Sequence, residues 1–150
     1  MSGSPQAEAR RALALFSRGS YLLTATFEHK RAGQIVQSVQ PCADEPMLVC
    51  VAARKGHPIE PLIRDAHRFA ICLIDQEDKL LLRNFGAPPA AGRGDPFDAL
   101  ELDRLTTGSP IPKRCLAALD CQVIRHLDLE ADHELYIGQV LAGRTYSHRI

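Results

Sequence analysis

Apolar and polar residues alternate with the period of a β-strand along much of the chain. Strand formers fill residues 21–27 and 34–39, and the polar turn between them predicts a hairpin. Residues 115–129 and 134–146 are two longer alternating segments on either side of a second polar turn. Residues 68–74 predict a further strand. This pattern indicates a mainly β protein.

Three segments between these strands break the alternation. Residues 47–53 are continuously apolar, which predicts a central strand buried on both faces. Residues 40–46 carry proline at two positions and predict a loop. Residues 86–98 are rich in proline and glycine, which predicts a long surface loop within one domain.

Three segments have helical spacing of apolar residues. Residues 5–18 predict an amphipathic helix with Ser4 as its N-cap. Residues 58–66 predict a short helix, and residues 76–85 predict a third helix capped by Asp75. About six or seven strands and three helices suit an antiparallel barrel with helical decoration. We expect residues 1–150 to form a single domain.

Composition narrows the classes of function. Hydrophobic residues make up 45% of the chain and the formal net charge is zero, which argues against a nucleic-acid or anionic-membrane surface built on bulk charge. No apolar run approaches the ~20 residues that span a bilayer. Residues 1–6 lack the pattern of a secretory signal, so we expect a cytoplasmic protein without nucleic-acid or membrane partners.

The cysteines and histidines indicate neither a disulfide framework nor a metal site. The chain has five cysteines, none with C-x-x-C spacing, and six scattered histidines. We therefore expect no disulfide scaffold and no zinc site. Cys42 lies in the predicted loop and is the thiol expected to be most reactive.

Candidate chemistry begins with a basic turn before the second predicted helix. Arg54, Lys55 and His57 flank Gly56 there. A helix N-terminus with neighbouring cations suits an anion such as a phosphate. An exposed basic turn without a ligand is the alternative.

A second candidate is the polar cluster at residues 131–134, which precedes an alternating strand. His133 lies in this cluster. On residue type alone, a histidine at a hairpin is more often a solvated turn residue than a catalytic one. The sequence order along the chain favours a functional role.

These segments, in their order, resemble the flavin reductase-like family. The resemblance rests on Gly33 and Ser38 in one strand, Pro46 before the strand 48–52, and the Asp-His pair that ends in His133. It extends over nearly the whole chain, from about residue 12 to residue 146. The chain differs from the family pattern at several polar positions, which are Gln37, Val39, Pro41 and Ala43.

The resemblance implies an FMN-binding split barrel, a six-stranded antiparallel Greek-key barrel that forms a homodimer. It implies one FMN for each subunit near the dimer interface, with FAD as the alternative flavin. Its motifs carry over to a set of expected cofactor-binding residues, which are Gln37, Ser38, Val39, Arg54, Lys55, Gly56, His57 and Phe85.

The resemblance also implies an activity, that of an NAD(P)H:flavin oxidoreductase. His133 would be the catalytic residue that positions the nicotinamide of NADH or NADPH, because hydride passes directly between the two cofactors. The reduced flavin or its electrons would go to a partner such as a monooxygenase. One alternative is an electron-transfer or flavin-storage protein without nicotinamide oxidation. Another is a barrel that binds a different ligand.

Overall fold

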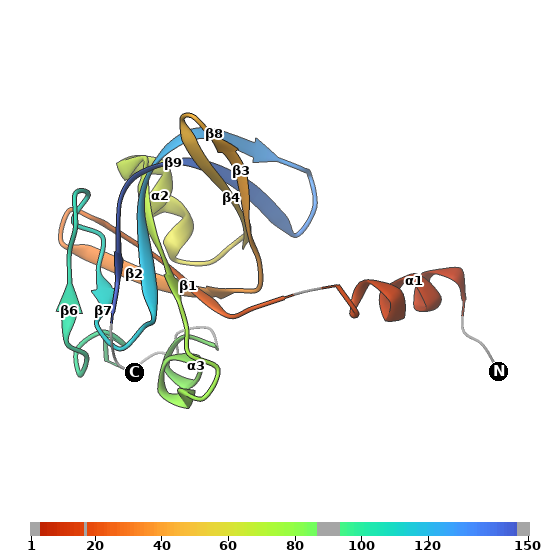
Figure 1. The fold of residues 1–150 in the computed structure, drawn as a ribbon, viewed down its shortest axis with the longest axis horizontal. Helices are drawn as coiled ribbons and strands as arrows, with labels where there is room; N and C mark the ends of the chain where they lie inside the picture. The colour runs from red at the N-terminus through yellow and green to blue at the C-terminus, as the bar shows by residue number, and fades with distance from the viewer. Residues whose placement is uncertain (1–3, 17, 87–93, 147–150) are drawn as a thin grey trace.

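The computed structural model describes residues 4–16, 18–86 and 94–146 (Figure 1). Within these residues the chain forms three helices and nine strands. In chain order they are α1 (Pro5–Leu13), β1 (Tyr21–Phe27), β2 (Lys30–Val36), β3 (Val39–Asp44), β4 (Met47–Arg54), α2 (Ile59–Ala66), β5 (Arg68–Leu73), α3 (Lys79–Phe85), β6 (Leu102–Asp103), β7 (Ile111–Pro112), β8 (Ala117–Asp128) and β9 (His133–Thr145).

A single antiparallel sheet of seven strands, in the order β2-β1-β5-β8-β9-β4-β3, curls into a barrel (Figure 1). The strands β6 and β7 form a separate two-stranded sheet beside it. The expected mainly β barrel is therefore confirmed. Its seven strands lie within the predicted number, but β3 occupies a segment that was predicted to be a loop.

The loop predicted for residues 40–46 is wrong, because most of it is strand β3. This strand pairs with β4 and its register shifts between Pro41 and Ala43. It is the last strand of the sheet, and a proline that donates no hydrogen bond is tolerated at such an edge. Cys42 lies at this irregularity and is exposed, as expected, although in a strand.

The prediction that residues 47–53 are buried on both faces is also wrong. Strand β4 buries alternate residues, Val49, Val51 and Ala53, on the inner face of the barrel. Its outward residues are only partly buried. The run is apolar on both faces, yet within the described residues no element of the chain covers the outer one completely.

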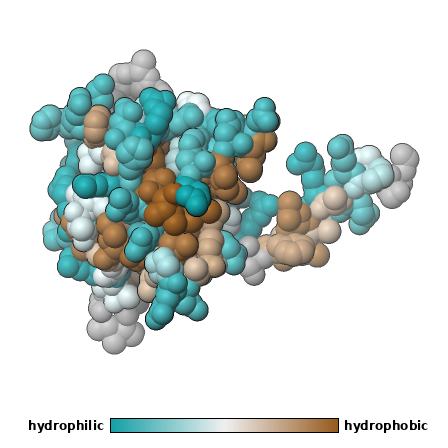
Figure 2. Space-filling view, turned by 90° about the horizontal axis from the view of Figure 1, so that it is seen from above, coloured by the Kyte–Doolittle hydropathy of each residue, from teal (hydrophilic) through white to brown (hydrophobic). Residues whose placement is uncertain are grey.

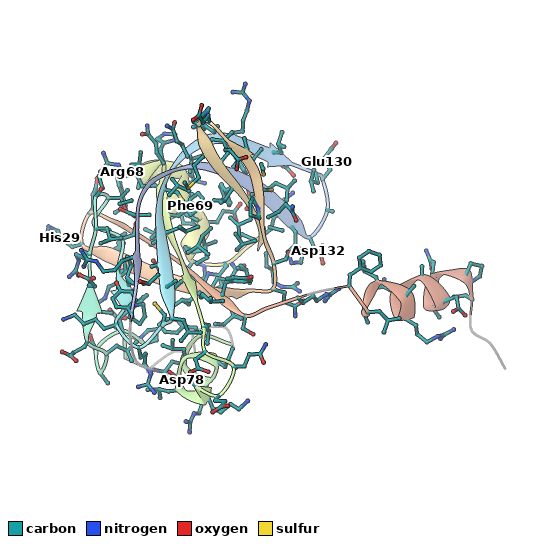
Figure 3. The ribbon with its side chains drawn as sticks, viewed as in Figure 1. His29, Arg68, Phe69, Asp78, Glu130 and Asp132 are labelled. Carbon is teal, nitrogen blue, oxygen red and sulfur yellow. The ribbon has the colours of Figure 1, made fainter. Side chains whose placement is uncertain are left out.

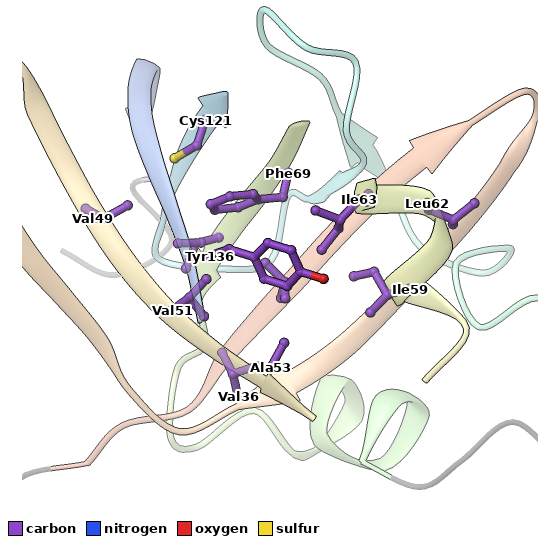
Figure 4. Packing of buried hydrophobic residues seen from close by; sticks show 13 residues of the cluster. Val36, Val49, Val51, Ala53, Ile59, Leu62, Ile63, Phe69, Cys121 and Tyr136 are labelled. Atoms are coloured by element: carbon purple, nitrogen blue, oxygen red, sulfur yellow. The ribbon is translucent and has the colours of Figure 1, made fainter. Parts of the chain in front are cut away.

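The strands buried on both faces are β1 and β5, and β5 lies between β1 and β8. Phe69 and Ile71 point into the barrel, where they pack with Tyr136 of β9 and with the apolar face of α2 (Figure 4). Ala70 and Cys72 point outward into a second cluster. Helix α3 and the segment that carries β6 and β7 cover that cluster, so α3 is fixed beside the barrel.

Two predicted helices have different ends in the structure. Helix α3 begins at Lys79, because the carboxylate of Asp78 accepts the N–H of Leu80 as its N-cap. Asp75, the predicted cap, instead accepts the N–H of Glu77 in the preceding turn. Helix α1 is capped by Ser4 as predicted but ends at Leu13. Residues 87–93 of the predicted loop lie outside the described residues.

Helix α1 stands apart from the barrel (Figure 1). None of its residues is buried. Within the described residues no helix is both long enough and apolar enough to cross a membrane.

A side chain links β2 to β4 across the seam between two strands that are not neighbours in the sheet. The amide Oε1 of Gln34 accepts the backbone N–H of Arg54 at 2.7 Å, and its Nε2 donates to the Arg54 carbonyl at 3.3 Å. Gln34 is 6% exposed. Because buried backbone groups need partners, this side chain takes the place of a strand pairing.

Replacing Gln34 by methionine, which has a similar shape, should lower the free energy of unfolding by about 1–3 kcal/mol. The change leaves the backbone groups of Arg54 without this partner. Urea denaturation measures the effect. The same change at the exposed Gln76 should stay within about 0.5 kcal/mol of the parent chain. Equal losses of unfolding free energy in the two variants would show that Gln34 does not help to close the barrel.

Candidate functional site

The candidate site is a cavity of about 640 Å³ at the seam that Gln34 closes. Its apolar walls come from Ile35 and Val36 of β2, Ala52 of β4 and Phe85 of α3. Cavities of this size hold drug-sized or cofactor-sized ligands. Within the described residues, no group of three or more His, Cys, Asp or Glu side chains is arranged to hold a metal ion.

The structure brings most of the expected site residues to this cavity and leaves three outside its lining. The residues that line it are Gln37, Ser38, Arg54, His57, Phe85 and His133. Those that do not line it are Val39, Lys55 and Gly56. Val39 packs against the core of the barrel, where it pairs with Val51.

Arg54 and His133 are cross-strand partners at the mouth of the cavity, and Asp132 connects them. Arg54 lies opposite His133 in the pairing of β4 with β9. The Asp132 carboxylate is 2.9 Å from Nδ1 of His133 and 4.0 Å from the Arg54 guanidinium. The hydrogen bond to His133, followed by the charges of His133 and Arg54, lowers the pKa of Asp132. Asp132 thus orients the His133 ring and lies near the Arg54 guanidinium, and Figure 3 shows it at the edge of the barrel.

Lys55 turns away from the cavity because it pairs with Asp128. Its Nζ donates to the Asp128 carboxylate, and this contact raises the pKa of Lys55 and lowers that of Asp128. Gly56 follows with a φ of +80°, a conformation that glycine adopts without strain. Its N–H donates to the Glu60 side chain at 2.9 Å, so this turn is anchored to α2.

His57 offers the cavity a hydrogen-bond donor whose position is fixed by a backbone contact. Its Nδ1 accepts the backbone N–H of Ile59 at 3.0 Å, and burial lowers its pKa. A neutral imidazole that accepts at Nδ1 carries its proton on Nε2. His57 therefore adds a hydrogen-bond donor to the cavity without adding a charge at neutral pH.

Phe85 forms one apolar wall because glycine allows the approach of α3 to β2. A Cβ placed on Gly33 would lie 2.9 Å from the ring of Phe85. The other side of the ring packs against Phe97, with centroids 4.8 Å apart. Gly33, one of the residues on which the family resemblance rests, thus contributes to the site by letting Phe85 pack closely against β2.

Two further cavity residues, Gln34 and Arg18, were not among the expected site residues. Gln34 shares the inward face of β2 with Val36, so a polar residue in an otherwise apolar face was a usable signal. Arg18 donates to the side chain of Gln37 at 2.6 Å. No sequence pattern around Arg18 marks it as a site residue.

Comparison with known proteins places the chain in a family. Residues 13–149 match the family model described as Flavin reductase like domain. The chain therefore belongs to the flavin reductase-like domain family, as the motifs had indicated. Nitrilotriacetate monooxygenase component B from Mycobacterium thermoresistibile superposes with a TM-score of 0.83 at 26% identity, over 97% of this chain and 78% of that one. The split-barrel fold is thereby confirmed.

Two curated relatives illustrate the range of proteins that carry this domain. The putative diflavin flavoprotein A 2 of Synechocystis sp. is 30% identical over 140 residues, which are 91% of this chain and 24% of that protein. The FMN reductase (NADH) SmoA of Agrobacterium fabrum is 28% identical over 132 residues, 88% of this chain and 72% of that protein. The chain thus spans about a quarter of the diflavin relative.

The lowered pKa of His57 predicts a loss of stability in acid. Because its pKa in the folded chain lies below the unfolded value of about 6.5, the unfolded chain binds the proton first as pH falls. The contribution of His57 is present above pH 6.5 and is lost below it. Urea denaturation at pH 7.5 and 5.0 measures this difference, which should be smaller in His57→Gln. The exposed His29→Gln should keep it, and parallel losses in all three chains would contradict the assignment.

Proposed function

We propose that the chain is an FMN-binding NAD(P)H:flavin oxidoreductase whose flavin lies in the cavity at the seam. The observation that carries this proposal is the Arg54–Asp132–His133 cluster at the mouth of an apolar cavity of about 640 Å³. Membership of the flavin reductase-like domain family supports it. The proposal extends to residues 1–150 as one domain built around this cavity.

The residues of the cavity fit the parts of FMN. Ile35, Ala52 and Phe85 offer apolar surface to an aromatic ring system. Arg54 is free to turn its planar guanidinium to a phosphate, because it is 65% exposed and only loosely paired with Asp132. Ser38 supplies a hydroxyl at the same cavity. FAD contains the same parts, so it is the alternative flavin for this cavity.

Bound flavin would supply the acceptor for a hydride from reduced nicotinamide. The residues of the chain then have to bind and orient the two ligands. Asp132 holds His133 through Nδ1, which leaves Nε2 as the group directed at a docked nicotinamide. His57 offers its Nε2–H to a carbonyl or ring nitrogen in the cavity.

The outer face of β4 and β9 supports the proposal of a homodimer. Cys50 pairs with Ile137 and Ala52 pairs with Leu135 across these strands. All four are only partly buried and apolar. Figure 2, which looks onto the side where these strands lie, shows a brown apolar patch there. A second copy is the simplest cover for this face.

The neighbours support a partner that consumes reduced flavin. One similar structure is component B of a monooxygenase, and one relative is named FMN reductase (NADH). The second candidate function is an electron-transfer module without nicotinamide oxidation. The match to a diflavin flavoprotein favours that candidate. The cytoplasmic location stays a prediction.

The first test is absorbance of the purified chain after addition of FMN and desalting, followed by anaerobic titration with NADH and NADPH. Retained flavin that is bleached by either nucleotide is the expected result. His133→Ala should slow the bleaching at least about tenfold, because it removes an orienting group, while flavin retention changes little. Retention without bleaching would favour the electron-transfer module, and absence of any flavin binding would refute both.

Arg54→Ala should weaken FMN binding about tenfold and leave riboflavin binding nearly unchanged. The reason is that a charge-assisted hydrogen bond to the phosphate is lost, and riboflavin has no phosphate. Quenching of flavin fluorescence measures both affinities. Arg104→Ala, an exposed arginine that does not line the cavity, is the control. Equal losses for the two ligands would place Arg54 away from the phosphate.

A further inference from the structure

The segment of residues 5–16, here called the arm, has an apolar face without a cover. Leu13, Leu15 and Phe16 are 54%, 88% and 68% exposed. Helix α1 has nine residues, and a helix of that length is marginal in water without tertiary contacts. The arm projects from the barrel (Figures 1 and 2). The chain's own barrel leaves this apolar face mostly exposed, so the helix lacks the tertiary contacts that would stabilise it.

The turn between β8 and β9, residues 127–132, here called the hairpin tip, is a second uncovered apolar surface. Leu127 and Leu129 are 43% and 52% exposed. Three carboxylates alternate with them, those of Asp128, Glu130 and Asp132. Figure 3 shows Glu130 and Asp132 on the side of the barrel toward which the arm projects.

The arm and the hairpin tip are complementary in charge as well as in apolar surface. The charged residues of the arm are Glu8, Arg10 and Arg11, so the arm carries an excess of positive charge. In the hairpin tip, Asp128 already pairs with Lys55 and Asp132 lies beside His133 and Arg54, so Glu130 is the tip carboxylate that remains without an ion pair among the described residues. Opposite charges around an apolar contact steer association and set its register. In one chain the two surfaces lie apart (Figure 1).

We propose that the arm of one copy of this chain packs on the hairpin tip of a second copy. The inference rests on the homodimer proposed above, and it assigns the two surfaces that meet. In a twofold dimer the contact occurs twice, arm to tip and tip to arm. The leucines of the tip lie against Leu13, Leu15 and Phe16, and the arginines of the arm face the carboxylates.

This contact ties assembly to the candidate site. Leu13 and Phe16 of the arm line the outer part of the cavity. His133 and its partner Asp132 lie at the base of the hairpin tip. A second copy seated on the arm therefore borders the cavity, so each site is completed by residues from two chains.

Charge reversal tests the contact in the full chain. Arg10→Glu with Arg11→Glu should raise the dimer dissociation constant about tenfold at low salt, and Glu130→Arg alone should do the same. The triple variant should return to within about threefold of the parent chain, because opposite charges face each other again. Sedimentation velocity over a dilution series measures the constants. Glu28→Arg is the matched control, because Glu28 lies in an exposed turn next to His29, which Figure 3 shows on the side of the barrel away from the arm.

Leu15→Asp provides a second variant, which should weaken the dimer more than the charge reversals because the apolar contact is lost. Unchanged dissociation constants in all arm variants, or a chain that is monomeric at every concentration, would overturn the inference. Arm variants that alter flavin binding without altering assembly would also overturn the inference, because that result would mean that the arm packs on the barrel of its own chain. Flavin reduction is assayed separately. An arm-dependent dimer that binds no flavin would refute the proposed function alone.

Discussion

The closure of the barrel by Gln34 is the constraint on which the cavity depends. The hydrogen-bonded order of the sheet leaves β2 at one end and puts β4 beside β3 at the other. A side-chain amide bridges this seam with two hydrogen bonds to the backbone N–H and carbonyl of one residue, Arg54. This side chain bridges the two strands at one residue only, whereas a paired strand would join them along their length. The strands therefore stay separated on either side of the bridge. The cavity opens where the strands separate. The guanidinium of Arg54 lies at the cavity, and the backbone of the same residue is held by the Gln34 amide.

The second determinant is that β1 and β5 are buried on both faces. The inner face belongs to the barrel with Phe69 and Tyr136, and the outer face carries α3. Packing on the outer face holds Phe85 against Gly33 and thereby sets one wall of the cavity. The site is thus formed by parts of two cores that share the same strands. A substitution in either core would reach the site through this shared sheet.

Strand-forming residues predicted the positions of β1, β5, β8 and β9, although burial alternates only along β9 and the first part of β8, while β1 and β5 each bury four consecutive residues. The apolar run of residues 47–53 misled the prediction, because both faces of the strand are apolar although, within the described residues, only the inner face is fully buried. Strand β3 was missed because prolines normally break strands, and its position at the sheet edge is a tertiary fact. The order of motifs identified His133 and Arg54. The direction of Lys55 depends on Asp128, a partner 73 residues away, so no local pattern reveals it.

The neutral state of His57 has a thermodynamic consequence for a redox ligand. Reduction adds electrons, and a buried cation beside the ligand would bind the reduced form more tightly and shift its midpoint potential upward. Here the interior donor is uncharged, and Arg54 lies at the mouth, where solvent and salt screen it. If the cavity holds a flavin as proposed, its two oxidation states would then be bound with similar affinity, and its midpoint potential would stay close to its value in water.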